Sequence, residues 1–417
     1  MRLRPSLKLL VAALVIGIMP ASLFATDGYF SLGFGTKSKG MAGAGVAFNL
    51  GPMSPATNPA AIAIGPGGFD INVGLFNPNR QYEVVGNPSG YPGTFGLYPG
   101  KVESGSSLFA VPGLGYARNN GKLAFGLTMY GNGGMNTNYD FATFGAKPTG
   151  QNLSQLFVAP TVAFKLGENH AIGATAILAY QMFKAEGLQA FAMFSSDPAH
   201  VSNNGTDSSF GGGVRLGYLG NWTTFSLGAS YQTKVAMGTF DKYAGLFAEQ
   251  GDFDIPANWT IGVGIKPTAN LDIAVDVRQM YYSDVASIAN PILPNLMMAR
   301  LGADGGAGFG WEDMTVIKAG VLYRAGSWVW RGGYSYGAQP IPESEMLFNI
   351  IAPGVVENHL AFGFSREFGK RKSFDFALNR AFSNEIKGLN VLEAPGAQTI
   401  KLQMDQWDVT FGYSMKF

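Results

Sequence analysis

Hydrophobic and polar residues alternate along most of the chain, which is the periodicity of a β-strand. The pattern is clearest at the end, where apolar or aromatic side chains at every second position from Trp407 to Phe417 oppose polar or small ones. Residues 271–280 and 328–336 repeat it. We predict strands at 68–76, 106–117, 122–131, 156–166, 170–183, 210–219, 223–234, 258–266, 270–282, 315–325, 327–337, 358–368, 373–383 and 406–417.

The connections between these segments alternate between short and long. Every even-numbered strand but the last ends in a tight turn, such as 119–121 or 167–169, whereas the other connections are about 20 to 30 residues long. A transmembrane barrel has short periplasmic turns, long external loops, tilted strands near ten residues and no unpaired edge. A surface sheet of a soluble sandwich is the alternative, and the alternation disfavours it. We therefore predict an all-β fold: a transmembrane antiparallel β-barrel of about 14 strands over residues 68–417.

The first 25 residues have the composition of a secretory signal peptide. Arg2, Arg4 and Lys8 precede an apolar run at 9–18, which is too short to span a bilayer as a helix. Small residues favour cleavage after Ala25. An uncleaved helical anchor is the alternative. The mature chain is therefore expected to be exported.

Residues 26–67, called the hatch below, do not have a strand pattern. The segment is rich in glycine and other small residues, and 37–48 could form a short helix. This small, apolar composition favours packing as a plug inside the barrel lumen over a disordered periplasmic tail. No strand precedes its glycines, so a dinucleotide-binding loop is rejected.

Composition excludes several classes of function. The chain carries 29 Lys+Arg against 28 Asp+Glu, contains no cysteine and has three histidines, His170, His200 and His359. A near-neutral chain is not suited to nucleic acid, and these residues provide no metal or iron–sulfur site. No nucleophile motif accompanies the histidines, so we expect no catalytic residue, cofactor or metal.

Three stretches resemble a known family. Residues 40–63 (GMAGAGVAFNLGPMSPATNPAAIA), 255–284 and 311–344 are similar to the long-chain fatty acid and aromatic hydrocarbon transporters of the bacterial outer membrane (FadL/TodX type). Asn58, Pro59 and Ala60 match that family's Asn-Pro-Ala hatch element. The resemblance implies a 14-stranded barrel with a luminal hatch, in which a hydrophobic ligand is captured at external loops and released sideways into membrane lipid near the third strand. It implies a monomer without an energy source.

Glycines near the end of the third predicted strand mark the expected opening. Gly131, Gly133 and Gly134 fall at the external end of 122–131, and glycine within a strand often marks a bulge. An ordinary loop start is the alternative. By resemblance to outer-membrane proteins that end in an aromatic residue, Phe417 is expected to be the signal for the barrel assembly machinery.

Several long loops are apolar, unlike those of a porin for polar solutes. Leu188, Phe191 and Phe194 in one loop, and Phe240, Tyr243 and Phe247 in the next, recur near helical spacing. They suit either a loop core or a landing site for an apolar ligand. We expect passive uptake of hydrophobic molecules, most simply long-chain fatty acids; a general porin or a lipid-modifying barrel enzyme is the alternative.

Overall fold

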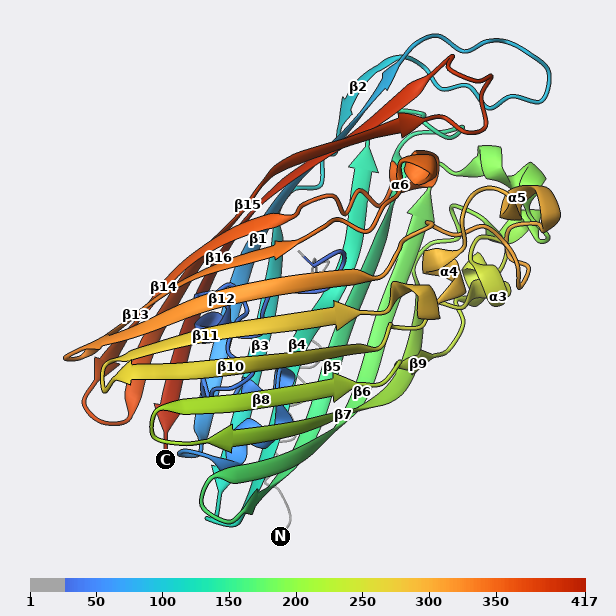
Figure 1. Cartoon of the computed structure of the whole chain (residues 1–417). Helices are drawn as coiled ribbons and strands as arrows, with labels where there is room; N and C mark the ends of the chain where they lie inside the picture. The colour runs from blue at the N-terminus through green and yellow to red at the C-terminus, as the bar shows by residue number, and fades with distance from the viewer. Residues whose placement is uncertain (1–26) are drawn as a thin grey trace, which may run out of the picture.

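The chain forms a closed antiparallel β-barrel. The computed structural model describes residues 27–417, so the expected signal peptide lies outside the described residues. Fourteen long strands form the wall (Figure 1): β1 (Gly68–Val85), β3 (Phe109–Asn119), β4 (Leu123–Tyr139), β5 (Thr149–Leu166), β6 (His170–Glu186), β7 (Asp207–Asn221), β8 (Phe225–Gln232), β10 (Asn258–Thr268), β11 (Leu271–Met280), β12 (Met314–Ala325), β13 (Trp328–Gly337), β14 (Asn358–Phe368), β15 (Lys372–Leu389) and β16 (Thr399–Lys416). Two short strands, β2 (Gly100–Glu103) and β9 (Ala236–Met237), pair at the edges of β1 and β7.

Pairing of the first and last long strands closes the wall. β1 and β16 run antiparallel from the pair Gly68–Lys416 to the pair Val85–Thr399. All other long strands pair with their neighbours in the sequence. The fourteen-stranded fold predicted from the sequence is therefore confirmed, and every predicted strand corresponds to one of these elements.

The two faces of each strand have different chemistry. In β12, buried and exposed residues alternate from Met314 onward, and Lys318 points to the buried, luminal face. Ile317 and Val321 belong to the exposed, outer face. An apolar outer face suits contact with lipid.

Several strands are longer than the sequence pattern indicates. β1 continues through Pro78 to Val85, where the predicted strand ends at residue 76. Pro78 is tolerated because the β1–β3 ladder ends at Phe76, so the proline has a strand partner on one side only. β4 also continues, through its glycines to Tyr139, instead of ending at residue 131.

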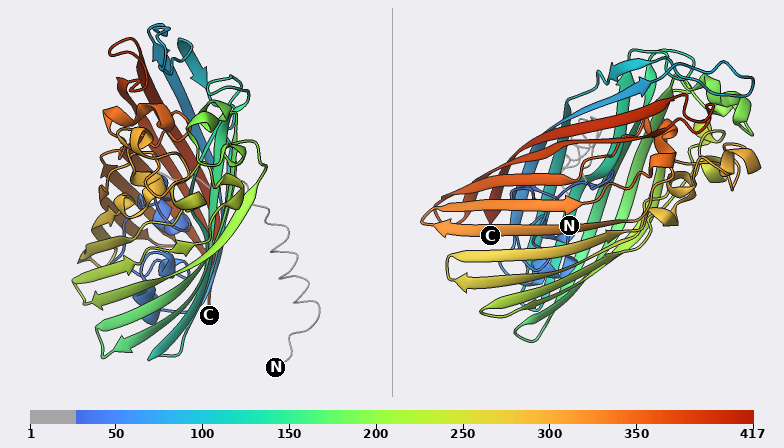
Figure 2. Two further views of the ribbon diagram at one scale, coloured as in Figure 1. Left: turned by 90° about the vertical axis from the view of Figure 1, so that its right-hand side faces the viewer. Right: turned by 45° about the horizontal axis from the view of Figure 1, so that its top comes forward.

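The hatch lies inside the barrel, as the blue segments in Figures 1 and 2 show. It contains one turn of helix, α2 (Thr36–Lys39), and two 3₁₀ turns, η1 (Ser54–Ala56) and η2 (Pro59–Ala63). The suggested helix over 37–48 is thus wrong beyond its first turn. Gly43 and Gly45 adopt φ angles of 78° and 123°, which are incompatible with an α-helix.

The long loops form a cap over one end of the barrel, whereas the short turns and the C-terminus lie at the other end (Figure 1). The cap contains short helical elements: η3 (Gln189–Phe194), η4 (Pro198–His200), η5 (Asp241–Tyr243), α3 (Ala248–Gly251), η6 (Tyr282–Asp284), α4 (Ala286–Ala289), α5 (Asn295–Met298), η7 (Glu343–Glu345) and α6 (Met346–Asn349). Within residues 27–417, no helix is long and apolar enough to cross a membrane.

Candidate functional site

Asn58 anchors the hatch to the barrel wall. Its side-chain Nδ2 donates hydrogen bonds to the carbonyls of Val46 and of Tyr218 in β7, each at 2.9 Å. Its Oδ1 accepts the N–H of Ala60 at 3.0 Å, which caps η2. Asn58 and Ala60 are almost fully buried. The amide therefore caps η2, joins it to the hatch segment at Val46, and attaches both to the wall at Tyr218.

Glycines of the inner wall allow this close approach. A Cβ on Gly173 of β6 would lie 2.5 Å from the carbonyl carbon of Pro59. A Cβ on Gly217 of β7 would overlap the side chain of Asn58. The predicted hatch residues 58–60 thus lie against wall positions that only glycine fits.

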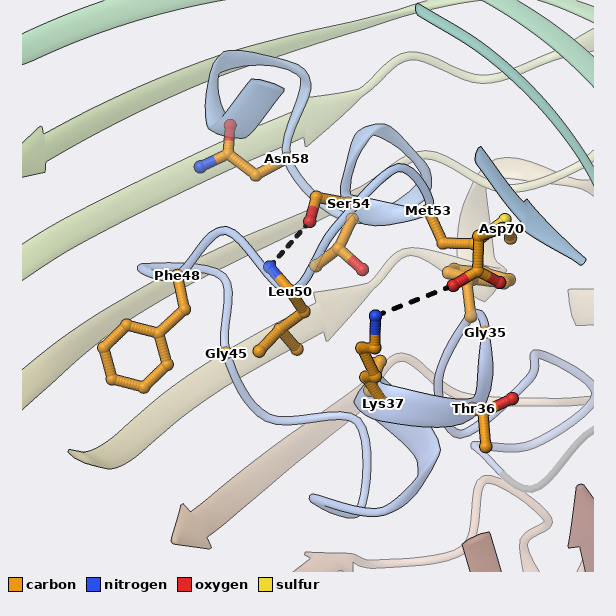
Figure 3. A pocket seen from close by; sticks show the side chains of 13 residues that line it. Gly35, Thr36, Lys37, Gly45, Phe48, Leu50, Met53, Ser54, Asn58 and Asp70 are labelled. Atoms are coloured by element: carbon orange, nitrogen blue, oxygen red, sulfur yellow. Dashed lines mark hydrogen bonds and ion pairs between the residues drawn. The ribbon is translucent and has the colours of Figure 1, made fainter. Parts of the chain in front are cut away.

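Ionic contacts hold the rest of the hatch. Lys39 Nζ lies 2.6 Å from the carboxylate of Asp408 in β16. Lys37 Nζ lies 3.9 Å from Asp70 Oδ2 of β1, as the dashed line in Figure 3 marks. Asp276 of β11 accepts two backbone N–H groups of the hatch, those of Gly45 and Val46 at 2.7 and 2.9 Å. The hatch is therefore tied to opposite sides of the lumen.

The first described residues form a second attachment. The Asp27 carboxylate, 1% exposed, lies 2.7 Å from Lys318 Nζ and 3.3 Å from Arg278 Nη1. The Tyr282 hydroxyl donates to the Asp27 carbonyl at 2.7 Å. Lys318 also donates to the carbonyl of Leu32 at 2.6 Å. Sequence reasoning missed this contact because the paired residues are far apart in the chain.

The ladder between β3 and β4 is interrupted beside this attachment. Pairing of the two strands ends at Gly113–Tyr130, although β4 continues to Tyr139. The β4–β5 register shifts between Gly131 and Gly133, which leaves Asn132 as a bulge. Gly131 and Gly133 therefore lie at a real irregularity in the middle of the strand, and Gly134 follows it.

The N-terminal segment pairs with β4 at the interruption. The N–H of Ser31 donates to the carbonyl of Asn132, and the N–H of Gly134 donates to the carbonyl of Tyr29, both at 3.0 Å. A Cβ on Gly133 would overlap the Tyr29 carbonyl oxygen. At these positions the hatch, rather than β3, forms hydrogen bonds with the backbone N–H and carbonyl groups of β4.

Two separate cavities lie among the cap loops and beside this part of β4. The first, called the loop cavity, has a free space of about 470 Å³, counting the part open to solvent. Six phenylalanines line it, and Ser287 is the polar side chain among its described lining residues; the phenylalanines are Phe144, Phe183, Phe191, Phe247, Phe309 and Phe348. A mostly apolar lining is typical of a site for a hydrophobic small molecule.

The second cavity, called the wall cavity, has about 310 Å³ of free space and lies against the β4 bulge. Gly28, Gly134 and Met135 contribute to its lining, together with Trp311 and Ala352. Phe309 and Ile351 line the loop cavity. The lining residues of the two cavities are therefore neighbours within two segments, 309–311 and 351–352, which are called the partition below.

The six predicted landing residues differ in their positions. Leu188, Phe191 and Phe247 line the loop cavity, and Phe194 is half-buried beside it. Phe240 and Tyr243 pack behind it against Phe183, with ring centroids 5.5 and 4.8 Å away.

Exposed methionines, rather than these aromatics, form the outer apolar surface. Met193, Met297 and Met298 are 75%, 80% and 81% exposed. The N–H of Leu301 donates to the carbonyl of Phe194 at 3.0 Å, which joins the segments that carry them. Met193 was not among the landing residues predicted from the sequence.

Phe417 lies at the end of β16 beside the start of β1. Its N–H donates to the carbonyl of Gly67 at 3.1 Å, and its exposed ring lies 5.8 Å from that of Tyr116. The terminal residue thus completes the seam that closes the barrel.

The three histidines lie apart from one another, and Ser335 of β13 is paired with His359 of β14 in the ladder. His200 contacts Asp197 at an exposed position, and His170 contacts the hydroxyl of Tyr218. His359 is buried in β14. Across residues 27–417, no group of acidic residues and histidines is arranged to hold a metal ion.

Solved structures share the fold. A toluene transporter of P. putida, TodX, is 19% identical with a TM-score of 0.68, covering 94% of this chain and 100% of that one. A Pseudomonas aeruginosa FadL homologue is 17% identical with a TM-score of 0.69, covering 94% and 99%. The Ralstonia pickettii toluene transporter TbuX is 19% identical with a TM-score of 0.62, covering 93% and 99%. No curated protein sequence matches the chain significantly.

The sequence matches the model of a protein family. The model for outer membrane transport proteins of the OMPP1/FadL/TodX type matches residues 20–417, which is nearly the whole chain. The chain therefore belongs to the OMPP1/FadL/TodX family and is a non-enzymatic channel for hydrophobic compounds in the bacterial outer membrane.

Proposed function

We propose that the protein takes up hydrophobic molecules passively by a route that passes through the loop cavity and ends in membrane lipid beside β4. A molecule first contacts the exposed methionines and then enters the loop cavity, displacing water from its phenylalanine lining. Burial of apolar surface drives this step. The flexible methionine side chains suit ligands of variable shape.

The second step passes the partition between the cavities. Trp311 is held there by a hydrogen bond from its Nε1 to Asn349 Oδ1 at 2.6 Å, and Thr137 of β4 donates to the Ile351 carbonyl at 2.9 Å. Small movements of this loop would join the cavities. The ligand would then reach Gly28 and the β4 bulge.

The third step is lateral release between β3 and β4. Detachment of residues 29–31 would leave the β4 edge near Asn132 without a strand partner, next to the wall cavity. The observation that carries this proposal is the hatch pairing with β4 where β3 does not. Such an exit delivers an apolar molecule to lipid without crossing the polar lower lumen.

The proposed route suits two classes of substrate, long-chain fatty acids and monoaromatic hydrocarbons. Fatty acids are the class expected from the sequence, while several similar structures are of toluene transporters or a monoaromatic hydrocarbon channel. The phenylalanine lining suits an aromatic ring as well as an alkyl chain.

Uptake into vesicles that contain the purified protein tests the proposal. Labelled oleate, toluene and a disaccharide would be offered in turn, and protein-free vesicles would give the background. We expect oleate or toluene, but not the sugar, to enter faster than background. Phe191→Asp should slow that entry because a charge in the cavity loses its hydration, whereas Tyr91→Asp, at an exposed position in the loop after β1, should not. Equal entry of sugar and hydrophobic probe would overturn the proposal.

A further inference from the structure

Charge is distributed unevenly between the two ends of the barrel. Within three residues of the six short turns and of the C-terminus there are three acidic residues, Glu168, Asp272 and Glu367, and ten basic ones: Arg118, Lys122, Lys165, Lys266, Arg324, Arg366, Lys370, Arg371, Lys372 and Lys416. The long connections at the other end carry five basic residues against fifteen acidic ones. The basic and the acidic end offset each other, so the total charge of the chain is nevertheless near zero.

The basic residues are densest at the turn between β14 and β15. Lys370, Arg371 and Lys372 follow one another there, and all three are exposed. The backbone N–H of Lys416 donates to the Arg371 carbonyl at 2.7 Å, which places the end of the chain beside the turn. Among the described residues, none of the three consecutive basic side chains forms an ion pair, and Glu367 instead contacts Lys416 at 3.3 Å.

Aromatic side chains place this turn at the membrane surface. The guanidinium of Arg366 lies over the ring of Trp328, 4.9 Å from its centroid. Trp330, Phe368 and Phe374 are 38%, 56% and 38% exposed on the outer face nearby. Belts of aromatic residues mark the depth of the lipid headgroups in membrane proteins. The basic side chains therefore extend from the edge of the lipid-facing band.

We propose that the basic turn formed by Arg366, Lys370, Arg371, Lys372 and Lys416 binds the headgroups of anionic phospholipids in the periplasmic leaflet. Charge complementarity selects the lipid, since clustered Lys and Arg beside an apolar band attract anionic headgroups. The guanidinium groups supply paired donors for a phosphate, and the lysines add charge. The acidic loops at the other end would not provide such a site, so the binding also favours one orientation of the barrel.

Native mass spectrometry of the purified full-length protein tests this site. The protein would be offered equal amounts of phosphatidylglycerol and phosphatidylcholine. The test variant carries Lys370→Gln, Arg371→Gln and Lys372→Gln. The matched control carries Arg118→Gln, Lys122→Gln and Lys165→Gln, which remove the same charge from other short turns. Heat-modifiable migration in gels would verify that both variants fold.

We expect the wild type and the control to prefer phosphatidylglycerol, and the test variant to lose that preference by about tenfold or more, as loss of three surface charges implies. Equal lipid binding by all three proteins would overturn the site, as would an equal loss in both variants, which indicates diffuse attraction. The readout does not depend on transport, so this inference and the proposed function can fail separately.

Discussion

Lys318 of β12 forms an ion pair with Asp27 of the hatch, with 2.7 Å between its Nζ and the carboxylate oxygen. The contact joins the wall to the segment that pairs with β4. Both side chains are almost fully buried, at 2% and 1% exposure. Breaking one partner of a buried pair is costly because it leaves the other charge without compensation.

We predict that Lys318→Met loosens the N-terminal segment without unfolding the barrel. Asp27 keeps Arg278, so the cost should be at most about 3 kcal/mol. Hydrogen exchange measured by mass spectrometry should then be faster, by at least about tenfold, for peptides covering residues 27–34. Lys39→Met, which breaks the contact of the hatch with Asp408, is the control and should leave that region protected. Unchanged exchange in the Lys318 variant would show that the pair does not hold the segment.

Gly133→Ala, a change in β4, should also detach the N-terminal segment that includes Tyr29. The new Cβ would overlap the Tyr29 carbonyl, and the hatch backbone has to move away. We expect protease cleavage near residues 29–31 and faster entry of hydrophobic probes into vesicles. Gly212→Ala in β7 is the control, because its Cβ would meet its nearest neighbour, the Ile177 carbonyl oxygen, at an ordinary 3.7 Å. Wild-type behaviour of both variants would contradict the assigned role of Gly133.

Removal of Phe417 should reduce the amount of folded, heat-modifiable protein in the outer membrane. The N–H of Phe417 donates a hydrogen bond to the carbonyl of Gly67 where β1 and β16 meet, and we expect the barrel assembly machinery to recognise this residue. Phe417→Tyr keeps an aromatic end and should assemble normally. If the deletion assembles as well as the wild type, Phe417 has no special role in assembly.

The cap should be more resistant to proteolysis at pH 5 than at pH 7.5. Burial, together with the charge of Asp254, raises the pKa of Asp252 to about 6. An acid whose folded pKa lies above its unfolded value binds an extra proton in the folded state, so its contribution to stability increases as pH falls from above 6 towards 4. The backbone carbonyl of Asp252 accepts a hydrogen bond from the hydroxyl of Ser287, which lines the loop cavity. Asp252→Asn should reduce the pH difference, and the remainder is assigned to Glu345 of the cap, whose pKa burial also raises. Asp284→Asn at an exposed position should preserve the difference. An undiminished pH difference in the Asp252 variant would assign it to other groups.

The wall was predictable because alternation of side chains determines both strand type and orientation. The same alternation predicts the direction of Lys318. Because this charged residue lies in mid-strand on the face opposite the apolar one, it must point into the lumen. Its partner Asp27 was not predictable, since sequence spacing carries no information about contacts between the hatch and a strand 291 positions away. Family membership now excludes the alternatives of a polar-solute porin and a barrel enzyme.

The end of β4 was misjudged for a physical reason. Glycines weaken a strand, so the pattern placed its end at Gly131. In the structure, Tyr29 and Ser31 supply backbone partners at the bulge, and β5 continues the ladder on the other side to Tyr139. The landing residues show a similar limit, because apolar loop residues that line a cavity and those that pack behind it, such as Phe191 and Phe240, have the same sequence pattern.

A reversible lock between the hatch and β4 tests the central claim most directly. The chain has no cysteine, so Ser31→Cys and Asn132→Cys would introduce one defined pair at two residues joined by a backbone hydrogen bond, next to the bridge between Phe30 and Gly133. Opposing residues of antiparallel strands have Cβ atoms about 4.5–5.5 Å apart, close to the separation in a disulfide. Entry of toluene and oleate into vesicles would be compared in the same preparation before and after reduction. If release requires detachment of residues 29–31, the oxidised protein should be blocked and reduction should restore entry. Equal rates in the two states would contradict lateral release beside β4.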